Sequence, residues 1–430
     1  MKNIFQNFVI SFYVFLTNFF LIFGYIYMSV RRNRSKETNT SFKQKLAQNF
    51  SSKPENKKII WIHAASIGEA YSGLSVAKII LKHNKETYIL FTTATLSSSK
   101  ILNDNENGRI IHQFLPLDVK HFVKKFLDYW SPRLSIFMES EIWPNYFLEL
   151  DRRHIPLYLL NARLSHRSFL RWNKLRILAN RIFSIPELIS CQDIDSYRRY
   201  KLLRQSNIII SENIKYANIP LKTDKEEREY LKKIFNKRFV YIAASMHENE
   251  NEIVFNLHRK LTEKYPNVVC IFAPRHPETH SKMIRLFDDD ARSWSYLPNY
   301  ELHPKCNFFI VNEVGILGTY FELSEIAIIG GSFGNIGGHN PIEAIQKNCI
   351  VLHGENIQNF NDIYDSLDRL KCSYLTSDEK SLMTKIEEFI DQPNETQDAL
   401  ESINKIINEK KTIVENETVS ILKKDLGEIQ

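Results

Sequence analysis

The chain has 430 residues, 43% of them hydrophobic and 12% aromatic, which is enough for two domains with full-size cores and excludes bulk disorder. Its net charge of +7 favours anionic partners without choosing between nucleic acid, acidic lipid and phosphorylated small molecules. Five widely spread cysteines, never in Cys-x-x-Cys spacing, exclude a zinc ribbon and a disulfide framework and fit a reduced compartment.

The amino terminus carries an uncharged run of 23 residues, 8–30, long enough to cross the hydrocarbon core of a bilayer. Lys2 alone precedes it, and four basic residues follow it, namely Arg31, Arg32, Arg34 and Lys36. This bias predicts a single N-terminal membrane anchor with its basic flank over residues 1–36, and a remaining chain on the cytoplasmic side. A cleaved signal peptide is disfavoured because the run is too long and lacks a small-residue cleavage site. Asn18 and the many aromatic residues leave open whether the anchor spans fully or inserts shallowly.

The rest of the chain reads as a polar linker followed by two domains. Residues 37–57 are rich in Ser, Lys and Asn and predict the linker. Short apolar runs then alternate with helix-length segments, which predicts βα units and a parallel sheet in each domain. The expected strands lie at 58–63, 88–91, 110–114, 134–138, 156–160, 239–243, 268–272, 308–311, 326–329 and 350–352. The pattern breaks near 213–220, so we predict Rossmann-like domains over 58–215 and 216–430 that face each other across a cleft.

The first expected strand is followed by the sequence HAASIGE, residues 63–69. Glu69 at a helix start beside a cleft is a candidate general base, which would take the proton from an attacking hydroxyl. Ser66 and Glu69 also have capping-box spacing, so the carboxylate is equally explained as a helix cap.

Two carboxylates, Glu139 and Glu141, follow the expected strand 134–138. With Trp143 as a flat apolar wall they suit polar recognition of a hydroxylated ligand. Acidic residues at a helix N-terminus, as Pro144 favours, are the alternative.

Residues 163–204, here called the basic belt, contain ten Lys or Arg against three acidic residues. Part of the belt is an amphipathic basic helix, which favours an anionic membrane surface or lipid. Nucleic acid is the competing partner, but no helix-turn-helix, RNA-recognition or zinc signature accompanies the charge. A merely solvated charged face is a further alternative.

Two stretches of the second domain predict a binding site for an anion. Arg275, after the strand at 268–272, offers a planar fork for phosphate. His276 and His280 have the spacing of a metal pair, but no third ligand cluster accompanies them, so no metal is expected. Five of the thirteen glycines fall within residues 330–338, directly before a helix start at Asn340. This loop predicts a phosphate cradle of backbone amides at a helix N-terminus, with a tight turn that binds nothing as the alternative.

Taken in order, seven stretches resemble the 3-deoxy-D-manno-octulosonic acid (Kdo) transferase family of lipopolysaccharide synthesis. They are WIHAASIGE (61–69), LPLD (115–118), ESEIWPN (139–145), NARLSHRS (161–168), APRHPE (273–278), GGSFGNIGGHNPIE (330–343) and NF (359–360). The resemblance covers nearly the whole chain.

The resemblance implies a GT-B α/β fold and an inner-membrane glycosyltransferase that transfers Kdo from CMP-Kdo to a lipid A precursor, with inversion and without a metal or other cofactor. Glu69 would be the catalytic base. The donor would be bound by Arg275, His276, Pro277, Gly330, Gly331, Ser332, Gly337, Gly338, His339, Asn340 and Glu343. The acceptor side would contain Ser66, Gly68, Glu139, Glu141, Trp143, Asn161 and Arg163, and the basic belt would meet the acceptor's phosphates. Neither the number of Kdo units nor the oligomeric state follows from the sequence.

Three stretches depart from the family pattern. NEVGIL at 312–317 lacks both acidic residues of Asp-Thr-x-Gly-Glu-Leu, SMHENEN at 245–251 replaces Ser-Thr-His-Pro-Gly-Glu-Glu, and Glu212 replaces the glycine of Gly-Asn-x-Lys. The departures put donor affinity in question. The rival functions are another lipid-directed transferase with a different nucleotide sugar and a non-catalytic, membrane-anchored nucleotide- or lipid-binding protein.

Overall fold

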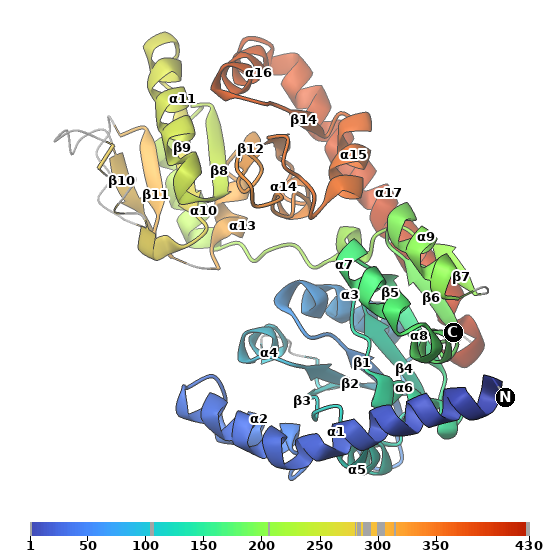
Figure 1. Ribbon diagram of the computed structural model, residues 1–430. Coiled ribbons are helices and arrows are strands. Elements are labelled where there is room, and N and C mark those ends of the chain that lie inside the picture. The colour runs from blue at the N-terminus through green and yellow to red at the C-terminus, as the bar shows by residue number, and fades with distance from the viewer. Residues whose placement is uncertain are drawn as a thin grey trace. The chain divides into compact units, whose positions relative to one another are not determined.

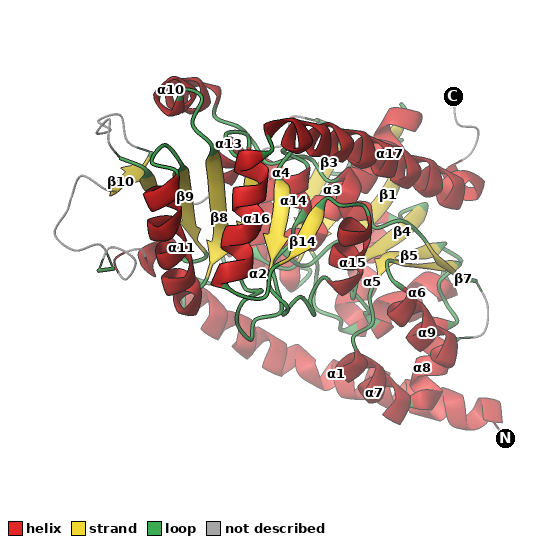
Figure 2. Ribbon diagram, turned by 90° about the horizontal axis from the view of Figure 1, so that it is seen from above, coloured by secondary structure: helices red, strands yellow, loops and turns green. Residues whose placement is uncertain are grey.

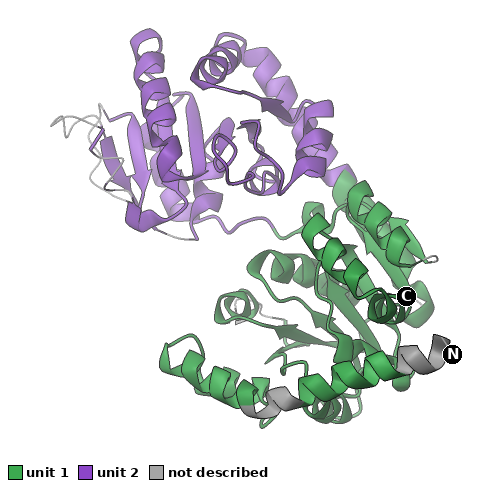
Figure 3. Ribbon diagram, in the orientation of Figure 1, with its two compact units in different colours: residues 1–219, 410–430 green, residues 220–409 purple. Residues whose placement is uncertain are grey.

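The computed structural model describes residues 2–103, 107–204, 207–279, 281, 285–286, 294–298, 306–313 and 315–426. They form two compact units, one of residues 1–219 with 410–430 and the other of residues 220–409 (Figure 3). Each unit is built around a seven-stranded sheet in which all the strand pairs are parallel. This confirms the α/β prediction of two parallel sheets.

The first sheet has the strand order β3-β2-β1-β4-β5-β6-β7 (Figure 1). Its strands are β1 (Lys58–His63), β2 (Thr87–Thr93), β3 (Ile110–Phe114), β4 (Leu134–Met138), β5 (Leu157–Ala162), β6 (Leu188–Cys191) and β7 (Ile208–Ile210). The helices between them are α3 (Ile67–His83), α4 (Leu96–Asn103), α5 (Lys120–Trp130), α6 (Pro144–Arg152), α7 (His166–Lys174), α8 (Arg176–Phe183) and α9 (Ile194–Leu203). Every residue of β4 and β5 is buried, as expected of strands covered on both faces.

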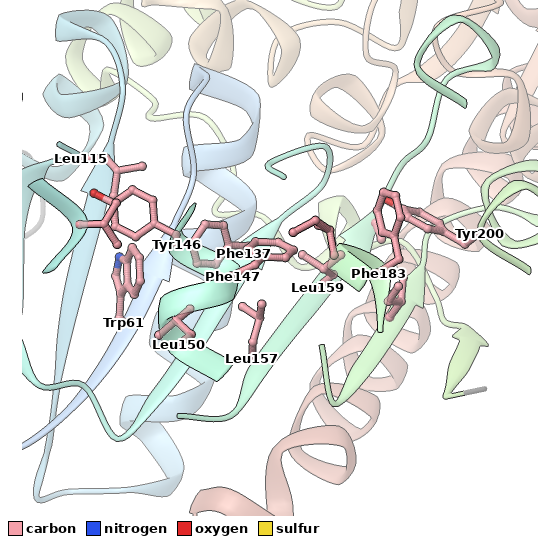
Figure 4. Close-up of a cluster of buried hydrophobic side chains, with 14 of the residues drawn as sticks. Trp61, Leu115, Phe137, Tyr146, Phe147, Leu150, Leu157, Leu159, Phe183 and Tyr200 are labelled. Carbon is pink, nitrogen blue, oxygen red and sulfur yellow. The ribbon is translucent and has the colours of Figure 1, made fainter. Parts of the chain in front are cut away.

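The core of the first unit is aromatic. Trp61 of β1 is fully buried, its ring lies 4.9 Å from that of Phe137 and 5.4 Å from that of Tyr146, and its indole N–H donates to the Thr92 hydroxyl (Figure 4). Large rings buried to this extent contribute strongly to stability. They fix β1, β4 and α6 relative to one another, and the loops discussed below begin at these elements.

The second sheet has the order β10-β11-β9-β8-β12-β13-β14. Its strands are β8 (Val240–Met246), β9 (Val269–Pro274), β10 (Trp294–Leu297), β11 (Phe308–Val311), β12 (Ile326–Ile329), β13 (Ile350–His353) and β14 (Ser373–Leu375). Helices flank these strands (Figure 2), namely α10 (Lys225–Phe235), α11 (Asn251–Lys264), α13 (Leu317–Phe321), α14 (Ile342–Ile345), α15 (Asn361–Arg369), α16 (Glu379–Asp391) and α17 (Pro393–Leu426). Short 3-10 turns are η1 (Ile214–Ala217), η2 (Glu248–Glu250) and η3 (Pro277–Thr279).

The expected anchor is one helix, α1 (Lys2–Asn33), which packs against α8, α5 and α2 (Asn39–Lys45) of the first unit. Within the described residues, no single helix has both the length and the apolarity to cross a bilayer. By length and composition only, the pair Phe8–Asn18 and Phe23–Asn33, which meet at a 45° bend, could do so together. The single spanning helix of the sequence prediction is therefore not confirmed.

The segment predicted as a linker, 37–57, is folded. Thr38 caps α2 through a capping box, and Phe42, Leu46 and Ala47 are buried. The Lys45 ammonium lies 2.7 Å from the buried Glu37 carboxylate, which also pairs with Arg31 of α1. The prediction was wrong because polar composition was taken as solvation, whereas these charged groups are buried as partners of one another.

The carboxyl terminus belongs to the first unit, although the sequence pattern assigned it to the second domain. Helix α17 begins in the second unit, and its residues from Lys410 onward lie in the first (Figure 3). The Lys410 ammonium lies 2.7 Å from the Glu212 carboxylate, and Val414 and Leu422 are buried. Hydrophobic periodicity identifies the apolar face of a helix but not the unit that covers this face. The sequence pattern therefore did not show that the C-terminal part of α17 packs in the first unit.

Candidate active site

The two sheets share one topological feature, the point at which the strand order reverses. In the first sheet β1 lies between β2 and β4, with His63 level with Phe137, and in the second β8 lies between β9 and β12. Ligands of open α/β sheets bind beyond the carboxyl ends of the strands at such a switch point. The loops that follow β1, β4, β8 and β12 are therefore the candidate positions, and they carry most of the residues identified from sequence.

Glu69 lies in the first turn of α3, and its carboxylate makes two short hydrogen bonds. The backbone amides of Ala65 and Ser66 both donate to the same atom, Oε2, at 2.8 and 2.9 Å. The Ser66 hydroxyl accepts from the Glu69 amide at 3.3 Å, which completes the capping box. Among the described residues no donor reaches Oε1. The cap therefore uses one carboxylate oxygen and leaves the other for a ligand.

Beside Glu69 a second carboxylate is held by two donors. The Trp143 indole N–H donates to Glu141 Oε2 at 2.7 Å, and His63 Nε2 lies 3.0 Å from the same oxygen. His63 is fully buried, and its Nδ1 lies 2.9 Å from the Thr92 hydroxyl. Burial would raise the pKa of Glu141, but the bonds from His63 and Trp143 lower it. Glu141 therefore loses its proton at a lower pH than an ordinary glutamate does.

The pKa of Glu69 is raised to about 7, first by burial and then by the negative charges of Glu141 and Glu139. The amide hydrogen bonds from Ser66 and Ala65 act in the opposite direction. A carboxylate whose pKa lies near neutrality is matched to accepting a proton from a hydroxyl at physiological pH. Paired carboxyl groups with separated pKa values are typical of acid–base sites.

The remaining acceptor-side residues divide into exposed and structural positions. Ser66 and Gly68 lie on the exposed start of α3. Glu139 is buried; its Oε1 lies 3.1 Å from the Lys215 ammonium and accepts from the Asn161 amide at 3.4 Å. The Arg163 backbone amide donates to the Glu139 carbonyl, and its side chain is partly exposed. Glu139 and Asn161 thus hold the segment that contains η1, which favours a positioning role for them.

The basic belt is divided between neutralised and unpaired cations. Arg181 pairs with Asp151, Arg199 with Asp195, and Arg204 donates to the carbonyls of Phe183 and Pro186. Among the described residues, no ion pair forms at four exposed cations on and beside α7, namely Arg167, Arg171, Lys174 and Arg176. The cationic surface is therefore smaller than the sequence suggested.

In the second unit two imidazoles meet at the switch point. His339 Nε2 lies 2.8 Å from His247 Nε2, and the rings are stacked at 10°. Burial and then the charges of Arg275, His247 and His276 lower the pKa of His339 to about 4. Arg275 and His276 are exposed after β9, and Pro277 begins η3. The Arg275 guanidinium supplies positive charge to this surface, and the His339 imidazole, neutral near pH 7, adds hydrogen-bonding atoms for an anion.

Other residues of the second unit pack against the glycine loop, residues 330–338. Its glycines therefore need not indicate a phosphate site. A Cβ at Gly330 would lie 2.4 Å from the Ser245 carbonyl oxygen, and one at Gly337, where φ is +101°, 2.7 Å from the Asn359 amide nitrogen. Gly331 and Gly338 also have positive φ. The buried Glu250 carboxylate accepts from the amide of Gly331 at 2.8 Å and from that of Phe333 at 3.0 Å. Close packing therefore accounts for the glycines, and two of the loop's amides are already occupied.

The helix expected after the glycine loop is a single turn. Helix α14 has four residues, so its dipole is too small to carry an anion site. Asn340 accepts from the Ile342 amide at 3.2 Å and donates to Glu343 at 3.5 Å, as a local cap does. Ser332 is fully buried, and its hydroxyl donates to the Ile329 carbonyl. Of the residues predicted to bind the anion, Arg275, His276 and His339 are therefore better candidates than the loop backbone.

The sequence interpretation missed three residues that complete these sites, His63, His247 and Glu250. Each ends or closely follows a strand at a switch point, which is the signal that could have identified them. His280 lies outside the described residues. Among the residues that are described, no group of three or more His, Cys, Asp or Glu is placed to hold a metal ion.

Several solved structures have a fold similar to that of this chain. They include the HepE protein of Anabaena in complex with UDP-glucose, with a TM-score of 0.57, 14% identity and coverage of 85% of this chain and 99% of that one. A UDP-GlcNAc 2-epimerase from Neisseria meningitidis gives a TM-score of 0.55 and 13% identity, and covers 82% of this chain and 99% of that one. At such low identity the similarity shows the fold alone, that of GT-B-like α/β proteins.

Sequence relatives are more specific. The family model described as 3-deoxy-D-manno-octulosonic-acid transferase (kdotransferase) matches residues 40–218. A 3-deoxy-D-manno-octulosonic acid transferase of Haemophilus influenzae is 34% identical over 319 residues, 72% of this chain and 73% of that protein. One from Rickettsia felis is 33% identical over 366 residues, 84% of this chain and 76% of that protein. The chain belongs to the 3-deoxy-D-manno-octulosonic acid transferase family and is a glycosyltransferase, which confirms the resemblance seen in its motifs.

Proposed function

We propose that this enzyme transfers Kdo from CMP-Kdo to a lipid A precursor, with inversion at the anomeric carbon and without a metal ion. The observation that carries the proposal is the Glu69 carboxylate, whose Oε1 has no donor among the described residues and whose pKa is raised to about 7. Such a group accepts the proton of an acceptor hydroxyl as that hydroxyl attacks.

In the proposed reaction the acceptor oxygen forms a bond to the anomeric carbon of Kdo while the bond from that carbon to the CMP phosphate oxygen breaks. The hydroxyl proton moves to Glu69 Oε1, and CMP leaves with the bonding electron pair. Negative charge therefore grows on the phosphate, where Arg275, His276 and His339 would stabilise it. Glu141, held by His63 and Trp143, would keep the pKa of Glu69 high enough for proton transfer.

We further propose that the enzyme works at the cytoplasmic face of the inner membrane, with α1 in contact with the lipid. Supporting this, α1 exposes a series of large apolar side chains, among them Phe8, Phe12, Phe15, Phe23, Ile26 and Tyr27. An exposed apolar surface of this kind is typical of a membrane contact. Four cations on and beside α7, Arg167, Arg171, Lys174 and Arg176, suit anionic head groups.

The decisive experiment compares the wild type with Glu69→Gln, using CMP-Kdo and a tetraacyl lipid A precursor. We expect turnover to be lost, with CMP affinity unchanged because the proposed donor residues lie in the other unit. Retained turnover would count against Glu69 as the base. Calorimetry with CMP, UDP and ADP tests the donor, and a preference for UDP would contradict the proposal. Full activity in excess chelator is expected if no metal takes part.

A further inference from the structure

An apolar groove lies between α1 and the body of the first unit. Its volume is about 650 Å³, within the range of roughly 300–1,000 Å³ found for small-molecule sites. The residues that line it include Phe23 and Tyr27 from α1, Trp143 from the loop before α6, and Trp172, Leu175 and Leu178 from α7, α8 and the link between them. Aromatic and branched aliphatic side chains on all sides favour an apolar occupant.

The polar groups in the groove have partners within the protein. The half-buried Asp118 carboxylate accepts from the amides of Asn145 and Tyr146 at 3.2 and 3.1 Å, and from the Tyr13 hydroxyl at 3.3 Å. Thr17 donates to the Val14 carbonyl. These bonds use the carboxylate and the hydroxyls of Tyr13 and Thr17, and the Tyr27 hydroxyl accepts from Arg31. The groove therefore selects its occupant by apolar contact rather than by hydrogen bonding.

The helices that form one wall of the groove also carry cations. Trp172 and Leu175 lie in the same segment as Arg171, Lys174 and Arg176, which are exposed and, among the described residues, form no ion pair. An apolar groove bordered by unpaired cations is complementary to a molecule with a fatty acyl chain and a phosphate. It does not fit a second copy of this chain, which would bring the same positive charge.

Trp143 links the groove to Glu141. This side chain lines the groove, while its indole N–H donates to Glu141, the carboxylate whose charge acts on Glu69. A molecule that occupies the groove therefore contacts the residue that holds Glu141. This link favours the lipid substrate over a bulk membrane lipid as the occupant.

We propose that the groove binds one acyl chain of the acceptor lipid, with its phosphate on the cations of α7 and α8, and so positions the acceptor hydroxyl near Glu69. This inference rests on the proposed function. It assigns Trp172, Leu175 and Leu178 as residues that recognise the acyl chain.

Binding can be tested without turnover, because two tryptophans line the groove. The full-length protein in dodecyl maltoside is titrated with a lipid A precursor analogue that carries dibrominated acyl chains, and intrinsic fluorescence is recorded. We expect saturable quenching that is smaller in Trp172→Phe. Absence of quenching would overturn the proposal. Equal quenching by dibrominated phosphatidylglycerol that competes with the analogue would also overturn it, because the occupant would then be a membrane lipid.

A kinetic test uses Leu175→Trp, which fills the groove, with Leu170→Trp as the matched control. Leu170 is also an exposed leucine of the same segment, at 46% exposure against 57% for Leu175, but it does not line the groove. For the wild type and the control, each methylene removed from the acceptor's acyl chain should raise KM roughly fourfold. Leu175→Trp should show a raised KM with little dependence on chain length. Identical dependence in both variants would overturn the groove assignment, whereas a wild type without Kdo transfer would overturn the proposed function itself.

Discussion

The position of Glu69 is compatible with two roles at once, that of a helix cap and that of a general base. From sequence, the carboxylate was either a helix cap or a general base. In the structure both amides of the cap bond to Oε2, and Oε1 has no donor among the described residues. The same bonds orient the carboxylate, so capping fixes the geometry that proton transfer would need.

The pH dependence of turnover should report the Glu69 pKa of about 7. Below that pH the base is protonated, so kcat/KM should fall about tenfold for each pH unit. The measurement is a pH–rate profile from pH 5 to 9 with saturating donor. An acidic limb with its midpoint near the ordinary pKa of a glutamate would contradict the assignment.

Stability should depend on pH in a way that Glu69→Gln removes. Because the folded-state pKa of Glu69 lies above its ordinary 4.5, the folded protein binds this proton more tightly than the unfolded chain does. The stabilisation is present below about pH 4.5 and is lost as the pH rises through 7, by up to ~3 kcal/mol. Urea unfolding should therefore show that the stability of Glu69→Gln relative to wild type is higher at pH 8 than at pH 5.

Glu415→Gln is a control variant for which the pH dependence of stability should have the opposite sign. Hydrogen bonding to Lys82 lowers the pKa of Glu415, so its contribution is present above the ordinary pKa and lost in acid. This variant should lose relative stability as the pH rises from strong acid to about 4.5, and its relative stability should not increase between pH 5 and pH 8. The same trend in both variants would show that Glu69 is not the group responsible.

At the scale of elements, the loop after β12 shows that a glycine cluster can reflect packing. The loop lies against residues 245–249 and 356–359, and Glu250 ties two of its amides. In the sequence, the number of glycines and the helix-cap spacing could not distinguish a closely packed loop from a loop that binds a ligand. Both produce the same pattern of small residues before a helix start.

Glu250→Gln should loosen this loop. Glu250 Oε2 accepts from the amides of His247 and Gly331, and Oε1 accepts from Phe333, so a glutamine NH2 would face an N–H donor. We expect a loss of roughly 1–3 kcal/mol in the stability of the second unit and weaker CMP binding. Thermal unfolding and calorimetry would check this. Glu248→Gln, exposed in the same 3-10 turn, should have little effect, and equal behaviour of the two variants would refute the role of Glu250.

At the scale of the molecule, α17 belongs to both units. Its carboxyl-terminal half buries Val414, Thr418, Leu422 and Leu426 in the first unit, where Lys82 and His83 also pair with Glu415. The integrity of the first unit therefore depends on residues that follow the whole of the second unit in sequence.

Leu422→Ala should destabilise the first unit by about 2–5 kcal/mol, because Leu422 is fully buried. Hydrogen exchange should show faster exchange in α3 and β5 and unchanged exchange in α11. Leu382→Ala in α16 is the matched control, a fully buried leucine whose loss should affect the second unit instead. Faster exchange of the second unit alone in Leu422→Ala would contradict the assignment of α17.

The sequence by itself determined the alternation of strands and helices, the break between the two sheets, the family and most of the loops that carry polar residues. Its expected ends were correct for β1, β3, β4, β11 and β12, because a buried parallel strand is a continuous apolar run between polar neighbours. It missed β6, β7, β10 and β14, because these short strands are only partly buried, and three or four residues of mixed burial give no clear pattern. The equally short β11 and β12 are buried along their whole length.

Only the tertiary structure decided which polar groups are partners. His63, Trp143 and Glu141 come from two strand ends that the sheet order brings together, and the pKa of Glu69 depends on that meeting. The buried Glu37–Lys45 pair and the packing of the C-terminal part of α17 in the first unit were likewise decided by the tertiary structure. Such contacts join residues far apart in the chain or hidden in polar segments, so local patterns of hydrophobicity contain no record of them.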